Sequence, residues 1–374
     1  MSVDVLVVGA GISGCVLAER FASVAHKRVL VIDRRGHIGG NCHDCLDEAG
    51  ILIPLYGPHM FHTSYENVWQ YLGRFTQWQP YKHRVKSYVD GMLVPVPVNI
   101  ETVNRLFGLT MSSEGEMLNW LRNNTQEIKE PKTSEDVALM RVGRALYEKM
   151  FKNYTKKQWD RWPDQLDASL IGRIPVRTNF DDGYFSDKYE GVPARGYTSI
   201  FQNILDHKNI DVMLNIDYLK DRDALLRDIG GYETLIFTGR IDAFFDYRFG
   251  RLQYRSLEFE YETLDMECFQ SNVVINYPND PNDYPYMRVT EPKLYTGQRH
   301  QRTTIIREYP TWEGDPYYPV PSQDNLECYM RYEHAAKALE KDGTYLIGRL
   351  ANYKHLNMDQ AFKNALDLFA KIRG

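Results

Sequence analysis

Apolar and polar residues follow two different periods along the chain, and the periods divide it into segments of distinct structure. Short continuous apolar runs at 5–8, 29–32, 212–214, 235–237 and 345–347 have the length of buried strands. Helical patterns follow the first run, occupy 200–205 and begin again near Met358. Buried strands that alternate with helices indicate βαβ units and a parallel sheet.

The segments between these runs have other patterns. Residues 77–98 read as short strands with a hairpin turn at Asp90-Gly91. From 99 to 172 the pattern is helical, with Val142, Leu146 and Met150 four residues apart and a helix start at 133–136. Residues 252–320 alternate as in an antiparallel sheet with one solvated face.

These patterns predict an α/β protein of discontinuous domains. We expect a parallel-sheet domain from 1–76, 190–245 and 340–374, and a helical domain, a small bundle, inserted at 99–172. We expect an antiparallel β-sheet domain from 77–98, 173–189 and 246–339.

A glycine motif follows the first strand and indicates that this domain binds a dinucleotide. Gly9 permits a tight turn, Gly11 lets the backbone approach a pyrophosphate, and Gly14 lets the helix pack closely on the sheet. The N–H groups of the first helical turn, at Ile12 and Ser13, can face the phosphates. Asp33, at the end of the second strand, can accept hydrogen bonds from a ribose. The prediction is a Rossmann-type domain.

The residues after Asp33 favour FAD over a nicotinamide cofactor. Arg34, Gly39, Gly40 and Asn41 supply a basic residue and a glycine pair where the chain must pass the adenosine diphosphate again. The alternative is an ordinary strand-to-helix loop. Later glycines that follow predicted strands, Gly239 and Gly348, would also let the backbone approach the cofactor.

Composition excludes several classes of function. The 374 residues carry a net charge of −5, which gives no general attraction to nucleic acid or to an anionic membrane. No apolar run reaches membrane-spanning length and no signal peptide is evident, so we expect a cytoplasmic protein without membrane insertion. The five cysteines fit a reducing compartment.

Two short patterns invite a metal assignment. Cys42 and Cys45 have a CxxC spacing, but no second pair of ligands follows at a suitable distance. His59 and His62 are three residues apart without an evident third ligand. We therefore expect no metal, and interpret the histidines as lining a flavin or sugar pocket.

The chain resembles the flavin-dependent UDP-galactopyranose mutases over essentially its whole length. The motifs that carry the resemblance are GAGISG, HIGGN, YGPHMFHT, YTKKQW, RIPVR, NY, YMR, DPYYPV and GRLANYKHLNMDQ, in this order. The resemblance implies a redox-neutral isomerase that interconverts UDP-galactopyranose and UDP-galactofuranose on reduced FAD, whose N5 acts as nucleophile at the anomeric carbon. It also implies a role in galactofuranose biosynthesis for cell-surface polysaccharide, an external reductant such as NAD(P)H, and a homo-oligomer.

The same resemblance implies site residues. Catalytic roles fall to Arg173 and Arg288, which bind the diphosphate, and to His62, near the flavin and the sugar. Cofactor contacts extend to Arg349, Asn357, Met358 and His59. Residues 159–173 are expected to form a mobile substrate loop. The other substrate-binding residues are Tyr154, Trp159, Tyr184, Asn276, Tyr318 and His355, with Asn357 again.

Three departures from the family pattern affect the expected sugar and phosphate pocket. His355 replaces a common tyrosine, Arg240 stands where proline is usual, and Pro292 lies in a segment that lacks the usual aromatic residue and histidine. The alternatives therefore include a mutase for UDP-N-acetylgalactosamine or a dTDP-deoxyhexose. A flavin oxidoreductase of the amine-oxidase type is the other alternative, because a shared fold does not decide the reaction.

Overall fold

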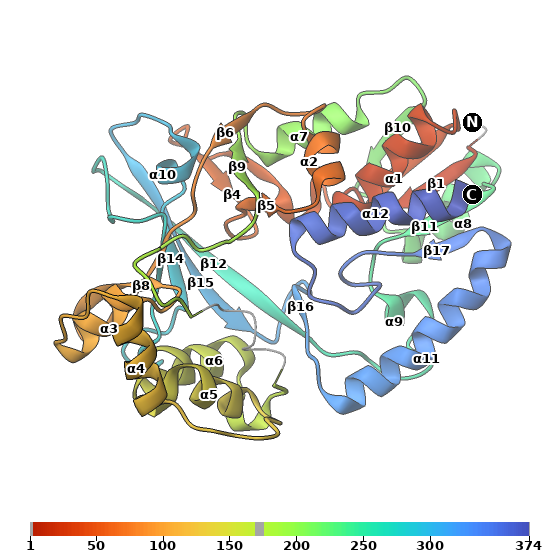
Figure 1. Ribbon diagram of the computed structural model, residues 1–374. Coiled ribbons are helices and arrows are strands. Elements are labelled where there is room, and N and C mark those ends of the chain that lie inside the picture. The colour runs from red at the N-terminus through yellow and green to blue at the C-terminus, as the bar shows by residue number, and fades with distance from the viewer. Residues whose placement is uncertain (1–2, 169–175, 374) are drawn as a thin grey trace.

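The computed structural model describes residues 3–168 and 176–373. The chain forms a parallel sheet covered by helices, a second and larger mixed sheet, and a group of helices beyond it (Figure 1). Within the described residues, none of the helices has the length and apolar character needed to cross a membrane.

The parallel sheet has the strand order β10-β2-β1-β11-β17, and every neighbouring pair in it is parallel. Its strands come from three distant parts of the sequence. The β1–β11 pair, for example, joins residues more than 220 positions apart. The strand bounds are β1 Val5–Val8, β2 Val29–Asp33, β10 Ile210–Leu214, β11 Thr234–Phe237 and β17 Thr344–Leu346.

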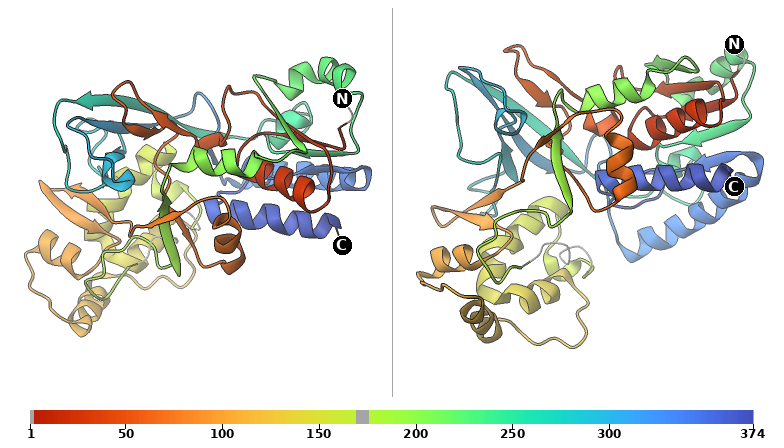
Figure 2. Two further views of the ribbon diagram at one scale, coloured as in Figure 1. Left: turned by 90° about the horizontal axis from the view of Figure 1, so that it is seen from above. Right: turned by 45° about the horizontal axis from the view of Figure 1, so that its top comes forward.

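Helices cover both faces of the parallel sheet, which explains why its strands are continuously apolar. Val5 and Val7 of β1 point into a core shared with α1 (Ile12–Ser23), α7 (Tyr197–Leu205) and α12 (Met358–Arg373). Leu6 points to the opposite face, against α8 (Tyr218–Ile229). Figure 2 shows α1 and α12 lying side by side on their face. The predicted parallel-sheet fold is confirmed.

The mixed sheet has the order β16-β12-β15-β14-β13-β7-β8. Its pairs are antiparallel except β13 with β7, which is parallel, so the expectation of a purely antiparallel sheet is wrong at that one position. The parallel pair arises because β7 enters from the distant hairpin β7–β8 rather than through a turn from β13. The bounds are β7 Val85–Val89, β8 Met92–Val96, β12 Tyr254–Leu264, β13 Val274–Asn276, β14 Arg288–Thr290, β15 Thr303–Thr311 and β16 Tyr318–Pro319.

Short strands connect the two large sheets. The order β5-β9-β6 places β5 (Phe61–Thr63) beside β9 (Tyr189–Pro193) and β6 (Trp78–Pro80), and β3 (Asp44–Leu46) pairs with β4 (Leu52–Pro54). α11 (Gln323–Leu339) packs against α9 (Ile241–Phe244) and β17, at the edge of the parallel sheet. The remaining short elements are α2 Glu66–Leu72 and α10 Lys293–Thr296, with single 3₁₀ turns at Gly40–Cys42, Pro163–Gln165 and Glu340–Asp342.

The helical insertion packs on the hairpin β7–β8. Thr133 caps α5 through a reciprocal pair of bonds with Asp136, as the sequence predicts for this start. The expected regular helix through Val142, Leu146 and Met150 is interrupted at Gly143, where φ is 76°, although all three apolar side chains are buried. Its elements are α3 Ile100–Phe107, α4 Glu114–Asn124, α5 Ser134–Leu146, a π-helical turn Tyr147–Phe151 and α6 Lys152–Trp159.

Candidate active site

Two glycine loops lie against each other at the carboxyl end of the parallel sheet. The N–H of Gly39 donates to the carbonyl of Ala10 over 2.7 Å, and a Cβ at Gly40 would lie 2.9 Å from the Cα of Gly11. The two loops that the sequence singles out separately therefore form one surface.

Gly11 is the residue of this surface that fits an external ligand. A Cβ there would meet nothing of the chain nearer than the Gly40 Cα, 3.7 Å away, so internal packing does not require glycine. The α1 helix begins after Gly11 without a side-chain cap, which leaves the N–H groups of its first turn for another acceptor. A dinucleotide diphosphate at this helix N-terminus fits both observations.

Asp33 holds the same two loops together. Its carboxylate accepts 2.8 Å hydrogen bonds from the N–H groups of Ala10 and Arg35. A carboxylate has further lone pairs for ribose hydroxyls, so its position at the end of β2 suits the predicted role.

The other glycines have reasons within the chain. A Cβ at Gly14 would lie 1.8 Å from the Gly9 carbonyl oxygen, as the predicted close helix packing requires. A Cβ at Gly9 would lie 1.9 Å from Thr238 Oγ1, and its φ is +109°. A Cβ at Gly239 would lie 2.7 Å from the Phe237 ring, and the predicted approach of its backbone to the cofactor stays a prediction. Gly348 has a φ of +110°.

The basic residue most closely associated with this surface is Arg35, which the sequence interpretation passed over in favour of Arg34. Arg35 donates to Asn41 over 2.9 Å, stacks on the Tyr56 ring at 4.3 Å and pairs with Asp315 at 2.7 Å. The Arg34 side chain is 54% exposed and also pairs with Asp315.

A row of polar side chains crosses the mixed sheet. Asn276 on β13 lies opposite Arg288 on β14, and Arg288 lies opposite Glu308 on β15. Directly opposed residues project from the same face, so the three are neighbours. Asn276 Oδ1, Arg288 Nε and Glu308 Oε1 are buried without a hydrogen-bond partner among the described residues. Buried polar groups are almost always satisfied, so these atoms mark a place where a ligand fits.

Tyrosines from three separate elements surround Arg288. Tyr154 lies on α6 and Tyr318 on β16, while Tyr184 lies in an irregular segment. The three are close enough for their charges to affect one another's titration and that of Arg288. Burial raises the pKa of all three phenols. They are therefore neutral hydroxyls that can donate hydrogen bonds to an anion.

Arg288 stays charged in this setting. Burial alone would lower the pKa of its guanidinium, but Glu308 and the surrounding phenols raise it overall. Arg288 Nε lies 3.5 Å from Glu308 Oε2, and the Glu308 side chain is only 2% exposed. Burial raises the pKa of Glu308 and Arg288 opposes that effect. The Arg288 guanidinium is therefore a cation that lies beside the buried Glu308 carboxyl group.

His62 lies beside this group with a fixed orientation. Its Nδ1 is 2.7 Å from Asp187 Oδ2, and its ring stacks on Phe185 with centroids 3.6 Å apart. Phe185 also stacks on His83, which is close to Arg288. Residues 184–187 therefore place one tyrosine at Arg288 and fix His62.

Arg349 connects the two regions. It lies near His59 and Cys42 on the side of the glycine loops and 5.9 Å from the Tyr318 ring on the side of the mixed sheet. Burial, with a smaller contribution from Arg349, lowers the pKa of His59 to about 4, so this histidine is neutral at pH 7. His355 stacks on Tyr318 with ring centroids 5.3 Å apart.

Asn357 and Met358 begin the last helix at the same junction. The Asn357 N–H donates to Gln360 over 2.9 Å, and Cys42 Sγ contacts Met358 Sδ at 3.7 Å. The last helix thus starts next to the glycine loops.

The structure shows no contact between described residues that links Trp159 to this site. Trp159 ends α6 half-buried, and among the described residues no hydrogen bond or ring contact joins it to the tyrosines. Arg173 lies outside the described residues. Two of the departures from the family pattern have local structural roles: Arg240 pairs with Asp242 at 2.6 Å, and Pro292 immediately precedes the short helix α10.

Glu308 and Asp187 are the main residues that the sequence interpretation missed. Glu308 shares the inward face of β15 with Thr304 and Ile306. An acidic residue at an inward position of a strand is visible in the sequence pattern and could have indicated a functional role. No comparable pattern identifies Asp187, because it lies in an irregular segment.

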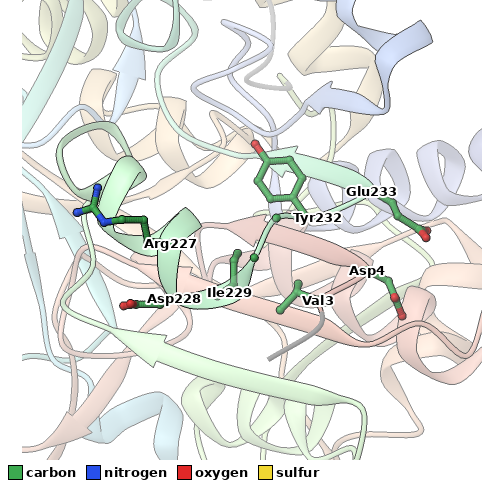
Figure 3. Close-up of a pocket in the computed structure, with 9 residues that line it drawn as sticks. Val3, Asp4, Arg227, Asp228, Ile229, Tyr232 and Glu233 are labelled. Carbon is green, nitrogen blue, oxygen red and sulfur yellow. The ribbon is translucent and has the colours of Figure 1, made fainter.

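A surface pocket of about 500 Å³ lies at the amino ends of the strands of the parallel sheet, opposite the glycine loops (Figure 3). Val3, Asp4 and Glu233 line it before β1 and β11, together with the end of α8. Ligands of open parallel sheets bind at the carboxyl ends of the strands, so this pocket is separate from the site. Across 3–168 and 176–373, no three His, Cys, Asp or Glu side chains gather as a metal site.

Comparisons with known proteins agree with the two regions of the site. A family model described as UDP-galactopyranose mutase matches residues 149–355, and one described as NAD(P)-binding Rossmann-like domain matches residues 7–75. The chain is 38% identical over 368 residues to a probable UDP-galactopyranose mutase of Klebsiella pneumoniae, covering 97% of this chain and 93% of that protein. It is 39% identical over 368 residues to a dTDP-fucopyranose mutase of Escherichia coli, covering 97% and 96%. The crystal structure of a reduced UDP-galactopyranose mutase shares the fold, with a TM-score of 0.75, 16% identity and coverage of 100% and 94%.

Proposed function

Because the chain belongs to the UDP-galactopyranose mutase family, we propose that it interconverts UDP-galactopyranose and UDP-galactofuranose without net oxidation. The observation that carries the proposal is the row Asn276, Arg288 and Glu308, whose buried polar atoms lack partners among the described residues, together with the three tyrosines near Arg288. A charged group beside neutral phenols and an amide suits a nucleotide diphosphate linked to a sugar.

The proposed cofactor is FAD in its reduced form. The open space at Gly11, the uncapped start of α1 and the Asp33 carboxylate support a dinucleotide at the glycine loops. When bound, reduced FAD supplies a nucleophile, its N5, for the anomeric carbon of the sugar. An external reductant such as NAD(P)H would have to supply its electrons.

The chain's own groups bind and orient the substrate. Arg288 is proposed to hold the diphosphate, which must leave the anomeric carbon and remain in place for the return step. Tyr184 and Tyr318 can donate hydroxyl hydrogen bonds to the same phosphates or to the sugar. Arg173 is proposed as a second diphosphate ligand from the resemblance alone. His62, oriented by Asp187, is proposed to lie beside the sugar.

A second candidate is a mutase for another nucleotide sugar, in particular a dTDP-deoxyhexose. It is supported by the relative of Escherichia coli named dTDP-fucopyranose mutase, which is as similar as the UDP-galactopyranose relative. His355 against Tyr318, where the family commonly has tyrosine, lies where the sugar-linked phosphate is expected. UDP-N-acetylgalactosamine belongs to the same class of alternatives.

The decisive experiment is turnover by chemically reduced protein on a panel of nucleotide furanoses. UDP-galactofuranose, dTDP-fucofuranose and UDP-N-acetylgalactofuranosamine are incubated separately, and the pyranose products are separated by chromatography. The proposal expects the fastest conversion of UDP-galactofuranose; faster conversion of the dTDP sugar would favour the second candidate. Conversion of none, or peroxide formation with net oxidation of a substrate, would point to an oxidoreductase instead.

A further inference from the structure

The ammonium group of Lys157 is buried in a shell of backbone carbonyls. Lys157 Nζ donates to the carbonyl oxygens of Tyr277, Tyr284 and Tyr286 over 2.5, 2.9 and 3.1 Å. The residue is 7% exposed, and no carboxylate pairs with it within the described part of the chain. An ammonium group has three donors, so all of them are used here.

These three carbonyls belong to one loop with site residues at both ends. The loop 277–287 begins directly after Asn276 and ends directly before Arg288, which lie opposite each other on β13 and β14. Tyr154 lies one helical turn before Lys157 on α6. A single side chain therefore fixes the helix of Tyr154 relative to the loop that separates Asn276 from Arg288.

A second contact fixes the same helix from the sheet. Arg255 on β12 donates to the carbonyls of Gln158 and Lys157 over 2.9 and 3.2 Å. These carbonyls belong to the last turn of α6, where the helix provides no partner for them. The α6 backbone is thus held by the mixed sheet, while Lys157 holds the loop of that sheet.

We propose that Lys157 is a positioning residue for nucleotide recognition: it aligns Tyr154 with Asn276 and Arg288 by closing the 277–287 loop around its ammonium group. This inference rests on the proposed function, because those three residues are the proposed substrate ligands. Lys157 itself acts through them and does not contact the substrate.

The positive charge matters for this role. Burial lowers the pKa of Lys157 to about 8, and only Asp280 opposes that shift. The group is therefore mostly charged at pH 7. A neutral side chain of similar length would leave the three carbonyls around this buried position without their donor, and such groups are costly.

Lys293 provides a matched comparison within the same chain. It is 6% exposed, and its Nζ donates to the carbonyls of Glu267, His300 and Arg302. These carbonyls lie in loops that adjoin none of the proposed substrate ligands. Loss of the Lys293 ammonium should therefore affect folding stability without changing nucleotide affinity.

The experiment compares Lys157→Met with Lys293→Met, and with Lys156→Met as a surface control in the same motif. UDP affinity is measured by calorimetry and turnover by chromatography. For Lys157→Met we expect KM and the UDP dissociation constant to rise at least about 10-fold, while kcat at saturation falls less than about 3-fold and flavin content is unchanged. Both control variants should bind UDP as the wild type does.

Chemical rescue separates the role of the charge from a general loss of packing. Lys157→Ala is assayed for UDP binding with added methylammonium, and with tetramethylammonium at the same concentration as a control without N–H donors. Methylammonium should restore at least about a third of the lost affinity, and tetramethylammonium should not. If Lys157→Met does not fold, this rescue in the alanine variant, read also as a rise in Tm, decides the question.

Failure of this inference is distinguishable from failure of the proposed function. Unchanged UDP affinity in folded Lys157→Met, or equal losses in Lys157→Met and Lys293→Met, would overturn the positioning role. Limited proteolysis within 277–287 is read in parallel and needs no substrate. If the wild type converts no nucleotide sugar but cleavage of this loop increases only in the Lys157 variants, the proposed function fails and the loop-closing role remains.

Discussion

The two regions of the site are built on different principles. At the glycine loops, two short segments, residues 9–14 and 33–41, pack against each other and form the surface where the cofactor is expected. On the mixed sheet, the site consists of side chains from β13, β14, β15 and β16 together with α6, which lies more than 100 residues earlier in the sequence. The first region depends on backbone shape, whereas the second depends on polar groups held on a rigid surface.

The two regions also differ in how the needs of folding relate to the needs of binding. Most glycines of the loops are needed by the fold itself, because a side chain there would collide with the backbone or with a neighbouring side chain. In the mixed sheet the unpartnered atoms of Asn276, Arg288 and Glu308 are unfavourable for folding and useful for binding. Arg349, between His59 and Tyr318, is one of the side chains that join the regions.

The largest expected effect tests the glycine loops. Gly14→Ala places a Cβ 1.8 Å from the Gly9 carbonyl oxygen, within a helix that cannot shift without moving the sheet. We expect a loss of at least about 4 kcal/mol in the free energy of unfolding, or no folded protein. Urea denaturation measures this loss.

Gly11→Ala is the matched control. Its Cβ would have ordinary space, so the free energy of unfolding without cofactor should change by less than about 1 kcal/mol. Flavin content should nevertheless fall sharply, since the new methyl group occupies the approach of the diphosphate. Retention of a full complement of flavin by Gly11→Ala would contradict the distinction between the two glycines.

The next effect concerns the mixed sheet. Arg288→Met removes the proposed diphosphate ligand, and we expect kcat/KM to fall at least about 100-fold, or about 2.7 kcal/mol, with flavin content unchanged. Arg307→Met is the control, because Arg307 belongs to the same pair of strands but forms ion pairs with Glu260 and Glu262. Similar losses of activity in both variants would argue against a specific role for Arg288.

Acid sensitivity is a smaller effect of the same region. Burial lowers the pKa of His83 to about 3, with smaller contributions from Arg288 and His62. The unfolded chain binds a proton below about pH 6.5 that the folded chain does not, so stability falls as the pH falls from 6.5 toward 3. At pH 5 the loss is about 2 kcal/mol.

His83→Gln should remove that part of the acid sensitivity. The measurement is urea denaturation at pH 7 and pH 5, and the exposed His334→Gln is the control. An equal difference between the two pH values in wild type and His83→Gln would show that another group is responsible.

The smallest effect tests the ion pairs that link the regions at Asp315. Arg35 is largely buried against Asn41 and Tyr56, while Arg34 is about half exposed. We expect Arg35→Met to cost about 1 kcal/mol of unfolding free energy and Arg34→Met less than about 0.5. Thermal unfolding of the two variants decides the order, and a larger loss for Arg34 would reverse our assignment of the inner arginine.

The parallel sheet and its glycine loops could be predicted because their signals are local. A buried strand followed by Gly9, Gly11 and Gly14 constrains the backbone wherever it occurs, and so does a strand that ends in Asp33. The break of α5 at Gly143 could not be predicted in the same way, because the contact that requires glycine there is tertiary: a Cβ would lie 2.0 Å from the Asn124 carbonyl oxygen. A helical period does not report such a contact.

The mixed-sheet site was reached only through resemblance, and only partly. Tyr154, Tyr184, Asn276, Arg288 and Tyr318 were expected there, but the geometry that brings Asn276 and Arg288 beside Glu308 depends on strand register. The roles of Glu308 and Asp187 depend on contacts with Arg288 and His62, which are 20 and 125 residues away in the sequence.

By itself, the sequence determined the strands of the parallel sheet, the helices between them and the glycine motif that follows the first strand. These are consequences of local sterics and of hydrophobic period, which act within a few residues. The tertiary structure decided which polar side chains share one face and which of them lose their solvent. Desolvation depends on everything packed around a group, so the charge of Arg288, the neutrality of His83 and the carbonyl shell of Lys157 belong to the fold as a whole.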